Sequence, residues 1–265
     1  MTGWREIADG VLIRRYAELD LTVGLVVGAE QALVVDTRGD HVQGAELAAA
    51  VRQVTPLPWQ IAITHGHFDH CFGTAAFLPA PVWAHERCAL HLRRTAEDQR
   101  AEWIEHYRHE APETAEALRT TTVISPDRLV GDRAELDLGG RTARLLHLGP
   151  GHTDHDLVVA AGDVVFAGDL VEQGAPPDFS DARPEHWPST LDNLLDLRPS
   201  VVVPGHGDPV GPDFVRSQRA EIAAAVELCR AGPPEGDLLA RSPFPEATTR
   251  AVLRSMNVGR FPDIH

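Results

Sequence analysis

The sequence predicts an α/β protein that forms one domain over residues 1–265. Short runs rich in valine, leucine and isoleucine alternate with amphipathic stretches of helical period. The chain is long enough to bury a large core, and its 43% hydrophobic and 24% charged residues are ordinary for a globular protein. The sequence shows no internal repeat, low-complexity tract or linker that would divide it. One α/β domain is therefore the simplest interpretation.

The first third of the chain predicts β-strands that change into a β-α alternation. Strand patterns occur in VLIRRY (11–16), LTVGLVV (21–27) and ALVVDT (32–37). Alanine, leucine and valine at helical spacing then predict a helix over 41–53. WQIAIT (59–64) follows as a buried strand. This order is typical of a sheet whose later strands are joined by helices.

Residues 85–119 predict a long helical insert that carries a single apolar stripe. The members of the stripe recur at spacings of four, four, seven and four residues: Cys88, Leu92, Ala96, Trp103 and Tyr107. The rest of the segment is charged, as expected of a helix that lies on a surface. Two interpretations stay open. The stripe either forms part of a substrate lid, or it only docks the helix onto the scaffold.

The remaining chain predicts a second group of strands followed by helices. The expected strands are RTARLLHL (141–148), LVVAA (157–161), VVFAGD (164–169) and, after a helix at 189–197, SVVVPGHG (200–207). The tail from 212 to 256 is expected to be mostly helical, with a break at the Gly/Pro cluster 231–236.

Charge and composition exclude several classes of partner and chemistry. The 39 acidic residues against 24 basic ones give a net charge of −15, which repels nucleic acids and acidic membranes. All basic residues are arginine, so a lysine Schiff base is excluded. Cys71, Cys88 and Cys229 lack CxxC spacing and predict neither a disulfide framework nor a thiolate zinc site. Without a signal peptide or a long apolar run, we expect a cytoplasmic protein that binds a small molecule.

The stretch AITHGHFDHCFG (62–73) concentrates metal-ligand side chains just past a predicted strand. His65 and His67 are two residues apart, so in an extended segment they point to the same side. Asp69 and His70 follow at the expected first turn of a helix, from which they can turn back toward the same space. The motif therefore predicts four nitrogen or oxygen donors that converge from six residues.

Three further ligand-type residues share one setting, a position just beyond a strand and beside glycine. They are His152 in LGPGHTDHD, Asp169 in FAGDL and His206 in VVVPGHGD. A single histidine in a loop is usually solvated, so none of them predicts a site by itself. Chance does not explain why all three residues share this setting.

With these residues in place, the sequence resembles the metallo-β-lactamase superfamily. The family pattern HxHxDH is matched by His65, His67, Asp69 and His70, and the later motifs follow in order from about residue 20 to 210. The resemblance implies an αββα four-layer sandwich, with two sheets face to face, helices outside and a metal site at one edge.

Carried over by position, the resemblance implies a dinuclear metal site. His65, His67 and His152 would hold the first ion, Asp69, His70 and His206 the second, and Asp169 would bridge them. Imidazole and carboxylate ligands suit zinc, with iron or manganese as alternatives. Two ions can share a hydroxide that attacks a carbonyl, and Asp69 is expected to orient it and handle its proton.

Several neighbours of the motif have both a functional and a plain structural interpretation. Asp36 in VVDT either fixes the tautomer of a ligand histidine or caps a turn. His155 and Asp156 either support His152 or are ordinary loop residues. Cys71 is expected to be a small buried residue. The histidines of the helical insert are expected to be solvated: His85, His91, His106 and His109.

The superfamily hosts many reactions, so the fold does not give the substrate. The leading hypothesis is a dinuclear zinc-dependent hydrolase of a small ester, thioester, lactone or lactam. A mononuclear iron oxidoreductase of the persulfide-dioxygenase type is the alternative, and a β-lactamase-like enzyme is another. Two features argue against a β-lactamase-like enzyme. The chain has no lysine, and it has an aspartate at position 169, where such enzymes commonly carry cysteine or serine. The sequence does not predict the oligomeric state.

Overall fold

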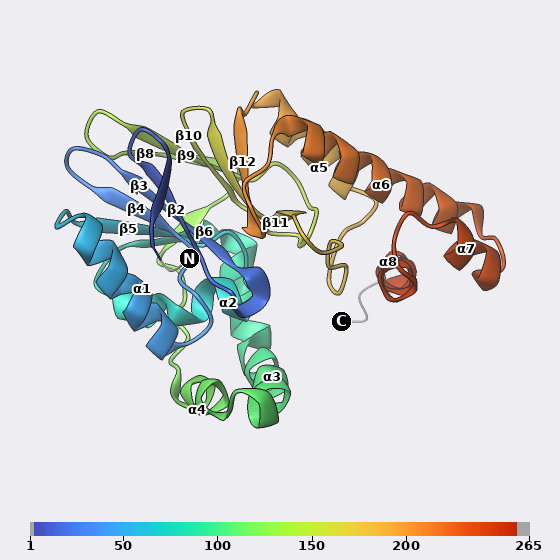
Figure 1. Cartoon of the computed structure of the whole chain (residues 1–265), viewed down its shortest axis with the longest axis horizontal. Helices are drawn as coiled ribbons and strands as arrows, with labels where there is room; N and C mark the ends of the chain where they lie inside the picture. Colours follow the sequence, from blue (N-terminus) through green and yellow to red (C-terminus); the bar gives the residue numbers. More distant parts are fainter. Residues whose placement is uncertain (1–2, 259–265) are drawn as a thin grey trace. The chain divides into compact units, whose positions relative to one another are not determined.

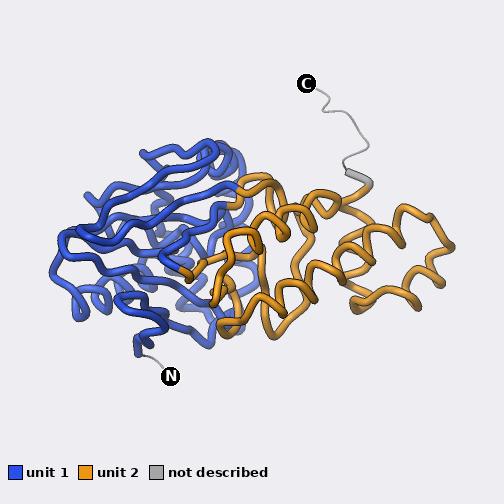
Figure 2. Tube along the Cα trace, turned by 90° about the horizontal axis from the view of Figure 1, so that it is seen from above, with its two compact units in different colours: residues 1–147, 157–162 blue, residues 148–156, 163–265 orange. Residues whose placement is uncertain are grey.

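The computed structural model describes residues 3–258, which fall into two compact units (Figure 2). Unit 1 comprises residues 1–147 and 157–162, and unit 2 comprises residues 148–156 and 163–265. One domain over residues 1–265 stays a prediction.

The chain is a mixed α/β structure with two sheets and helices (Figure 1). The strands are β1 (Arg5–Ala8), β2 (Val11–Arg15), β3 (Thr22–Val27), β4 (Ala32–Val35), β5 (Trp59–Ala62), β6 (Val82–His85), β7 (Arg128–Val130), β8 (Arg133–Asp137), β9 (Thr142–Leu146), β10 (Val158–Ala161), β11 (Val164–Glu172) and β12 (Val201–His206). The helices are η1 (Glu18–Asp20), α1 (His41–Val54), α2 (Phe68–Cys71), η2 (Phe72–Phe77), α3 (Glu86–Glu110), α4 (Pro112–Thr120), α5 (Trp187–Asp196), α6 (Pro212–Ala231), α7 (Glu235–Arg241) and α8 (Glu246–Val258).

The seven-stranded sheet of unit 1 follows the chain order from β1 to β7. Strands β1 to β4 pair antiparallel, whereas β4 to β7 pair parallel. Parallel neighbours need a crossover connection, which α1 supplies between β4 and β5, α2 and η2 between β5 and β6, and α3 and α4 between β6 and β7. Because parallel strands end at the same edge, the loop after β5 opens beside the end of β4.

The central strands of this sheet are buried on both faces. One set of alternate residues, including Leu25, Val34 and Ile61, packs with Leu47 of α1 and the other helices of unit 1 in a single apolar cluster. The intervening residues, such as Val26, Leu33 and Ala62, are also buried. Strands buried on both faces are expected of the inner part of a layered α/β fold.

Unit 1 also contains the antiparallel strands β8, β9 and β10. The turn between β8 and β9 is tied to the turn between β3 and β4, where the Glu30 N–H donates to the Leu138 carbonyl at 2.9 Å. Gly28 makes this approach possible, because a Cβ at that position would lie 2.1 Å from the Leu138 oxygen. The second group of strands is thus anchored to the first through backbone contacts.

Unit 2 is built on the parallel strands β11 and β12 and the helices α5 to α8. Every residue of β11 is buried. Trp187, at the start of α5, is fully buried, and its indole N–H donates to the Leu170 carbonyl of β11 at 3.1 Å. Apolar residues of α6 such as Val215 and Ile222 are also buried. Asp169 therefore lies on a strand that packing holds in place.

The structure confirms the predicted α/β class and the helical character of residues 85–119. It differs from the prediction in that this segment is two helices, with a break at Ala111. The break has a physical cause, since Pro112 has no N–H to continue the ladder of α3 but is favourable at the first turn of α4. Among residues 3–258, no helix is long and apolar enough to cross a membrane.

Candidate metal centre

Unit 1 brings the four donors of the HxHxDH motif into one cluster. His65 and His67 lie in the loop after β5, and Asp69 and His70 lie in α2. His65 Nε2 is 3.1 Å from His67 Nδ1, and the rings of His65 and His70 are 4.2 Å apart. Asp69 Oδ2 lies 3.5 Å from His70 Nε2. Three of the four are buried and His67 is half-buried, so the predicted convergence is present within this unit.

Asp36 determines the tautomers of two of these histidines. The Thr64 hydroxyl donates its only proton to Asp36 Oδ2 at 2.8 Å, so the Thr64 oxygen must accept from His65 Nδ1 at 3.1 Å. His70 Nδ1 lies 2.8 Å from Asp36 Oδ2 and must also be the donor to a carboxylate. Neutral His65 and His70 therefore carry their protons on Nδ1, which leaves Nε2 as the electron-pair donor, the form that a metal requires.

The Asp36 carboxylate is positioned by an unusual stretch of backbone at the end of β4. Asp36 and Arg38 adopt φ values of 64° and 71°, which are uncommon for residues with a side chain. The stretch is tied to α2 and η2, because the Thr37 N–H donates to the His70 carbonyl and the Gly73 N–H to the Arg38 carbonyl, both at 2.8 Å. The turn and the motif are thus one rigid substructure. This geometry supports the functional interpretation of Asp36 over the simple turn.

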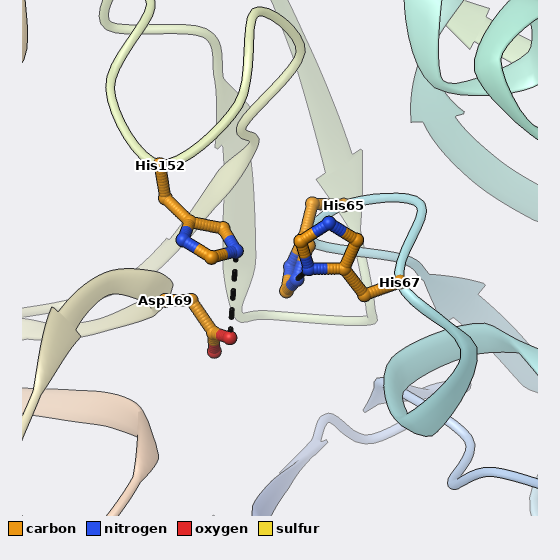
Figure 3. Close-up of side chains that lie close together, drawn as sticks. All are labelled: His65, His67, His152 and Asp169. Atoms are coloured by element: carbon orange, nitrogen blue, oxygen red, sulfur yellow. Dashed lines mark hydrogen bonds and ion pairs between the residues drawn. The ribbon is translucent and has the colours of Figure 1, made fainter. Parts of the chain in front are cut away.

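Unit 2 brings together the three later ligand candidates. His152 lies in the loop 148–156, Asp169 on β11, and His206 is the last residue of β12. Asp169 Oδ2 is 3.6 Å from His152 Nε2, a contact marked by the dashed line in Figure 3, and it is 3.3 Å from His206 Nε2. Gly205 lets the carboxylate lie against β12, because a Cβ there would be 1.8 Å from Asp169 Oδ1. One carboxylate oxygen is therefore shared by two imidazoles.

His152 is held in the same tautomer as His65 and His70. Its Nδ1 lies 3.3 Å from the backbone carbonyl of Asp178, which can only accept. Neutral His152 therefore presents an unprotonated Nε2 toward the Asp169 carboxylate. The neighbouring residues shape the loop, since Asp156 accepts from the Thr153 N–H and hydroxyl, and His155 Nδ1 contacts the Asp154 carboxylate at 2.8 Å. These contacts favour the interpretation of His155 and Asp156 as loop residues.

Glu172 is a functional candidate that the sequence analysis did not identify. It is a buried acid at the end of β11, and its Oε1 accepts from the Asp178 N–H at 2.9 Å. Burial, together with the negative charge of Asp169, raises the pKa of the Glu172 carboxyl to about 8. The available signal was a glutamate at the end of a mainly apolar run, three residues after Asp169.

The helical insert contacts the motif through side chains of α3. Gln99 Nε2 donates to the Gly66 carbonyl at 3.0 Å, and the Trp103 ring stacks on Phe68 with centroids 4.2 Å apart. Tyr107 is only 7% exposed and belongs to the apolar cluster of unit 1. The stripe therefore docks α3 onto the motif, which supports the second of the two interpretations given above.

The predictions for Cys71 and for the histidines of residues 85–119 have mixed outcomes. Cys71 is buried as expected, with its Sγ 3.1 Å from the His67 carbonyl, and burial raises the pKa of its thiol. His106 and His109 are exposed, as predicted. The prediction for His85 was wrong, because it is 2% exposed and caps α3 by accepting from the Arg87 N–H at 3.1 Å. His91 is half-buried, with its ring 6.2 Å from that of His67.

Comparisons with solved structures show proteins of the same fold. A metallo-beta-lactamase from Pontibacter korlensis is 20% identical with a TM-score of 0.66, over 84% of this chain and 99% of that chain. A metallo beta lactamase from Hirschia baltica is 17% identical with a TM-score of 0.63, over 82% and 95%. The DIM-1 metallo-beta-lactamase is 16% identical with a TM-score of 0.64, over 84% and 98%. At such identities the likeness establishes the fold alone, and it confirms the predicted metallo-β-lactamase sandwich.

A comparison of the sequence with curated proteins finds no match. The family model of the metallo-beta-lactamase superfamily, however, matches residues 19–206, which include both clusters described above. This match extends over more than half of the chain and agrees with the fold. The chain belongs to the metallo-beta-lactamase superfamily.

Proposed function

We propose that the protein is a dinuclear zinc hydrolase that cleaves a small acyl compound, namely an ester, thioester, lactone or lactam. One observation carries the proposal. His65, His70 and His152 each donate from Nδ1 to an oxygen acceptor, so each presents an unprotonated Nε2. Oriented imidazoles of this form, next to buried carboxylates, are the ligand set that zinc prefers.

The donors fit a cation on electrostatic grounds. The unprotonated Nε2 of His152 and the Asp169 oxygen, 3.6 Å apart, both present electron pairs and repel each other unless a positive charge lies near both. In the proposed assignment His65, His67 and His152 would hold one ion, and Asp69, His70 and His206 would hold the other. Asp169 would be the residue that both sites share, and its Oδ2 already lies close to two imidazoles.

The proposed chemistry uses bound zinc together with Asp69. Zinc in such a site supplies Lewis acidity and makes water acidic enough to act as a nucleophile near neutral pH. Asp69 is the acid–base residue in this proposal: its buried carboxylate orients the attacking water and accepts its proton. The position of Asp69 at the start of α2, tied to the Asp36 turn, keeps the carboxylate oriented.

Metal content tests the proposal directly. We expect two zinc ions per chain by elemental analysis, and about one in His67→Ala and in His206→Ala, because each variant loses a ligand of a different ion. His109→Ala is the matched control, since His109 is exposed on α3. One iron per chain would instead contradict the zinc hydrolase and favour the oxidoreductase alternative. A panel of chromogenic esters, thioesters, lactones and β-lactams would then identify the acyl class.

Other properties are proposed more generally. A small-molecule substrate is consistent with the superfamily, and the net charge of −15 opposes nucleic acid as a partner. A cytoplasmic location stays an expectation from the sequence. The names of the structural neighbours describe those proteins and not this one. β-Lactams are therefore tested here as one class in the substrate panel.

A further inference from the structure

Unit 2 contains a cavity of about 300 Å³ that the proposed chemistry does not use. Its wall is formed by the segment after β11, by one side of α6 and by the turn between α7 and α8. The residues that matter for the argument are Glu172, Pro176, Phe214, Ser217, Gln218 and Pro245. The volume lies at the lower end of the range for small-molecule pockets.

The cavity lies next to the metal-ligand candidates of unit 2. Glu172, which lines the cavity, is the register partner of His206 in the parallel strands β11 and β12, and it is three residues from Asp169 in the sequence. Asp178 connects the same wall to His152, because its N–H donates to Glu172 Oε1 and its carbonyl accepts from His152 Nδ1. A substrate whose reacting bond lies at these ligands could therefore place a side group in the cavity.

The chemistry of the wall favours an uncharged apolar group. The four prolines at positions 176, 177, 243 and 245 have no N–H to donate, and Phe214 and Phe244 add aromatic surface. The side-chain amide of Gln218 already has two hydrogen-bond partners. Its oxygen accepts from the Glu172 N–H, and its nitrogen donates to the Leu170 carbonyl. Among the described residues that line the cavity none is basic, whereas Glu172 and Glu221 are acids. A carboxylate would thus meet no cation and lose its hydration.

Much of this wall comes from outside the segment that the family model matches. The match ends at residue 206, whereas α6 begins at Pro212 and the turn between α7 and α8 lies further along the chain. The cavity is therefore formed largely by the C-terminal helices of this chain. A feature built in this way is suited to determine which substrate a shared metal centre receives.

We infer that this cavity binds an uncharged apolar side group of the substrate, such as a short acyl chain or one aromatic ring, and excludes groups that carry a carboxylate. The inference rests on the proposed hydrolase function for its biological meaning. Its physical content is a binding preference that direct measurement can test without catalysis. Neutral aryl or alkyl esters and lactones are then the expected substrates, rather than acyl compounds whose side group is anionic.

Binding of benzyl alcohol and benzoate, which have the same ring and differ in charge, tests the inference. Titration calorimetry on the protein as purified should show benzyl alcohol binding that Ser217→Met removes, because the longer side chain fills the cavity. The matched control Ala224→Met, at an exposed position of the same helix, should bind like the wild type. Benzoate binding that Ser217→Met removes should be weaker than benzyl alcohol binding by about fivefold, since a like charge costs about 1 kcal/mol at 4 Å in water.

A charge-reversal variant of Glu221 provides a second test. Glu221 lies on the exposed rim, so Glu221→Arg should strengthen benzoate binding and leave benzyl alcohol binding unchanged. Benzyl alcohol binding that survives Ser217→Met, or equal affinity for benzoate, would overturn the inference. Metal content is measured on the same samples. Loss of the cavity preference with two zinc ions still present would refute only this inference, whereas absence of zinc would refute the proposed function.

Discussion

Asp36 is the residue on which the geometry of the unit 1 cluster depends most. Its carboxylate accepts from the Thr64 N–H and hydroxyl and from His70 Nδ1, and through Thr64 it also fixes His65. One acid thereby sets the proton positions of two ligand histidines, each through a different route. A substitution here should change metal affinity without removing a ligand.

We predict that Asp36→Asn lowers zinc affinity by about 10–100-fold, the range for loss of a partner that orients a metal ligand. The asparagine amide would present a donor to His70 Nδ1, which favours the tautomer with its proton on Nε2. Competition with a chromogenic chelator measures the affinity. Asp40→Asn is the matched control, because Asp40 caps α1 and asparagine caps a helix equally well. An unchanged affinity in Asp36→Asn would mean that the carboxylate only shapes the turn.

Asp69 is predicted to matter more for rate than for folding. Asp69→Asn keeps the size of the side chain but removes the charge that accepts a proton, so kcat should fall by about 10²–10⁴. The assay uses any substrate that the wild type hydrolyses, at a zinc concentration that saturates both proteins. A melting temperature close to that of the wild type would separate the effect from unfolding. Unchanged kcat would remove Asp69 from the mechanism.

How far the site was predictable differs from residue to residue. The seven ligand candidates were identifiable because each is a ligand-type side chain, either in the HxHxDH motif or beside glycine near a predicted strand. Thr64, Asp178 and Glu172 were not identifiable. Thr64 acts through its hydroxyl and Asp178 through its backbone carbonyl, which are groups that many residues carry. Glu172 depends on burial, which a sequence pattern does not reveal. His85 was misjudged because its role as a helix cap depends on where α3 begins.

Among the secondary-structure elements, α3 has the clearest consequence for function. Its aromatic stripe packs against the helix that carries Asp69 and His70, through the stacked rings of Trp103 and Phe68. The contact is part of the apolar cluster of unit 1, in which Trp103 is half-buried. This arrangement indicates that α3 supports the motif rather than providing a loose cover.

Trp103→Ala should therefore act as a scaffold mutation. We expect a loss of roughly 2–3 kcal/mol in the free energy of unfolding, below the 3–5 kcal/mol typical of fully buried aromatic residues. The kcat/KM values should fall by a similar factor for substrates of different acyl size. Urea denaturation and a substrate series provide the two measurements, with His109→Ala as a control on the same helix. A loss that depends on acyl size, at unchanged stability, would instead favour the lid.

The elements themselves were predictable to different degrees. Strands β2, β3, β4 and β5 and helix α1 begin within one residue of the predicted positions, because each combines a clear apolar period with turn residues at its ends. Strands β1, β7 and β8 were missed, since exposed polar residues leave no continuous apolar run. Strand β6 was also missed, because its last residue, His85, was assigned to the helix that follows. The apolar pattern of the sequence identifies strands that are largely buried. Exposed strands such as β7 and β8 form because a neighbouring strand pairs with them, which the pattern does not reveal.

For the whole molecule, the proposed ions should contribute to stability as well as to chemistry. Their ligands come from segments between residues 65 and 206, so the complete set exists only in the folded chain. Ligands that bind only the folded state stabilise it by mass action. This contribution is separate from the apolar core, which the sequence pattern already indicated.

Removal of zinc should therefore lower the melting temperature. At free zinc 100 times the dissociation constant, one site stabilises the folded state by about 2.7 kcal/mol, and 1 kcal/mol shifts the melting temperature by about 2–4 °C for a chain of roughly this size. Chelation should then cost about 5–10 °C for each site. Scanning calorimetry with excess zinc or with EDTA measures the difference, which should be smaller in His67→Ala and in His206→Ala than in wild type or His109→Ala. Identical melting curves with and without EDTA would contradict tight zinc binding at either site.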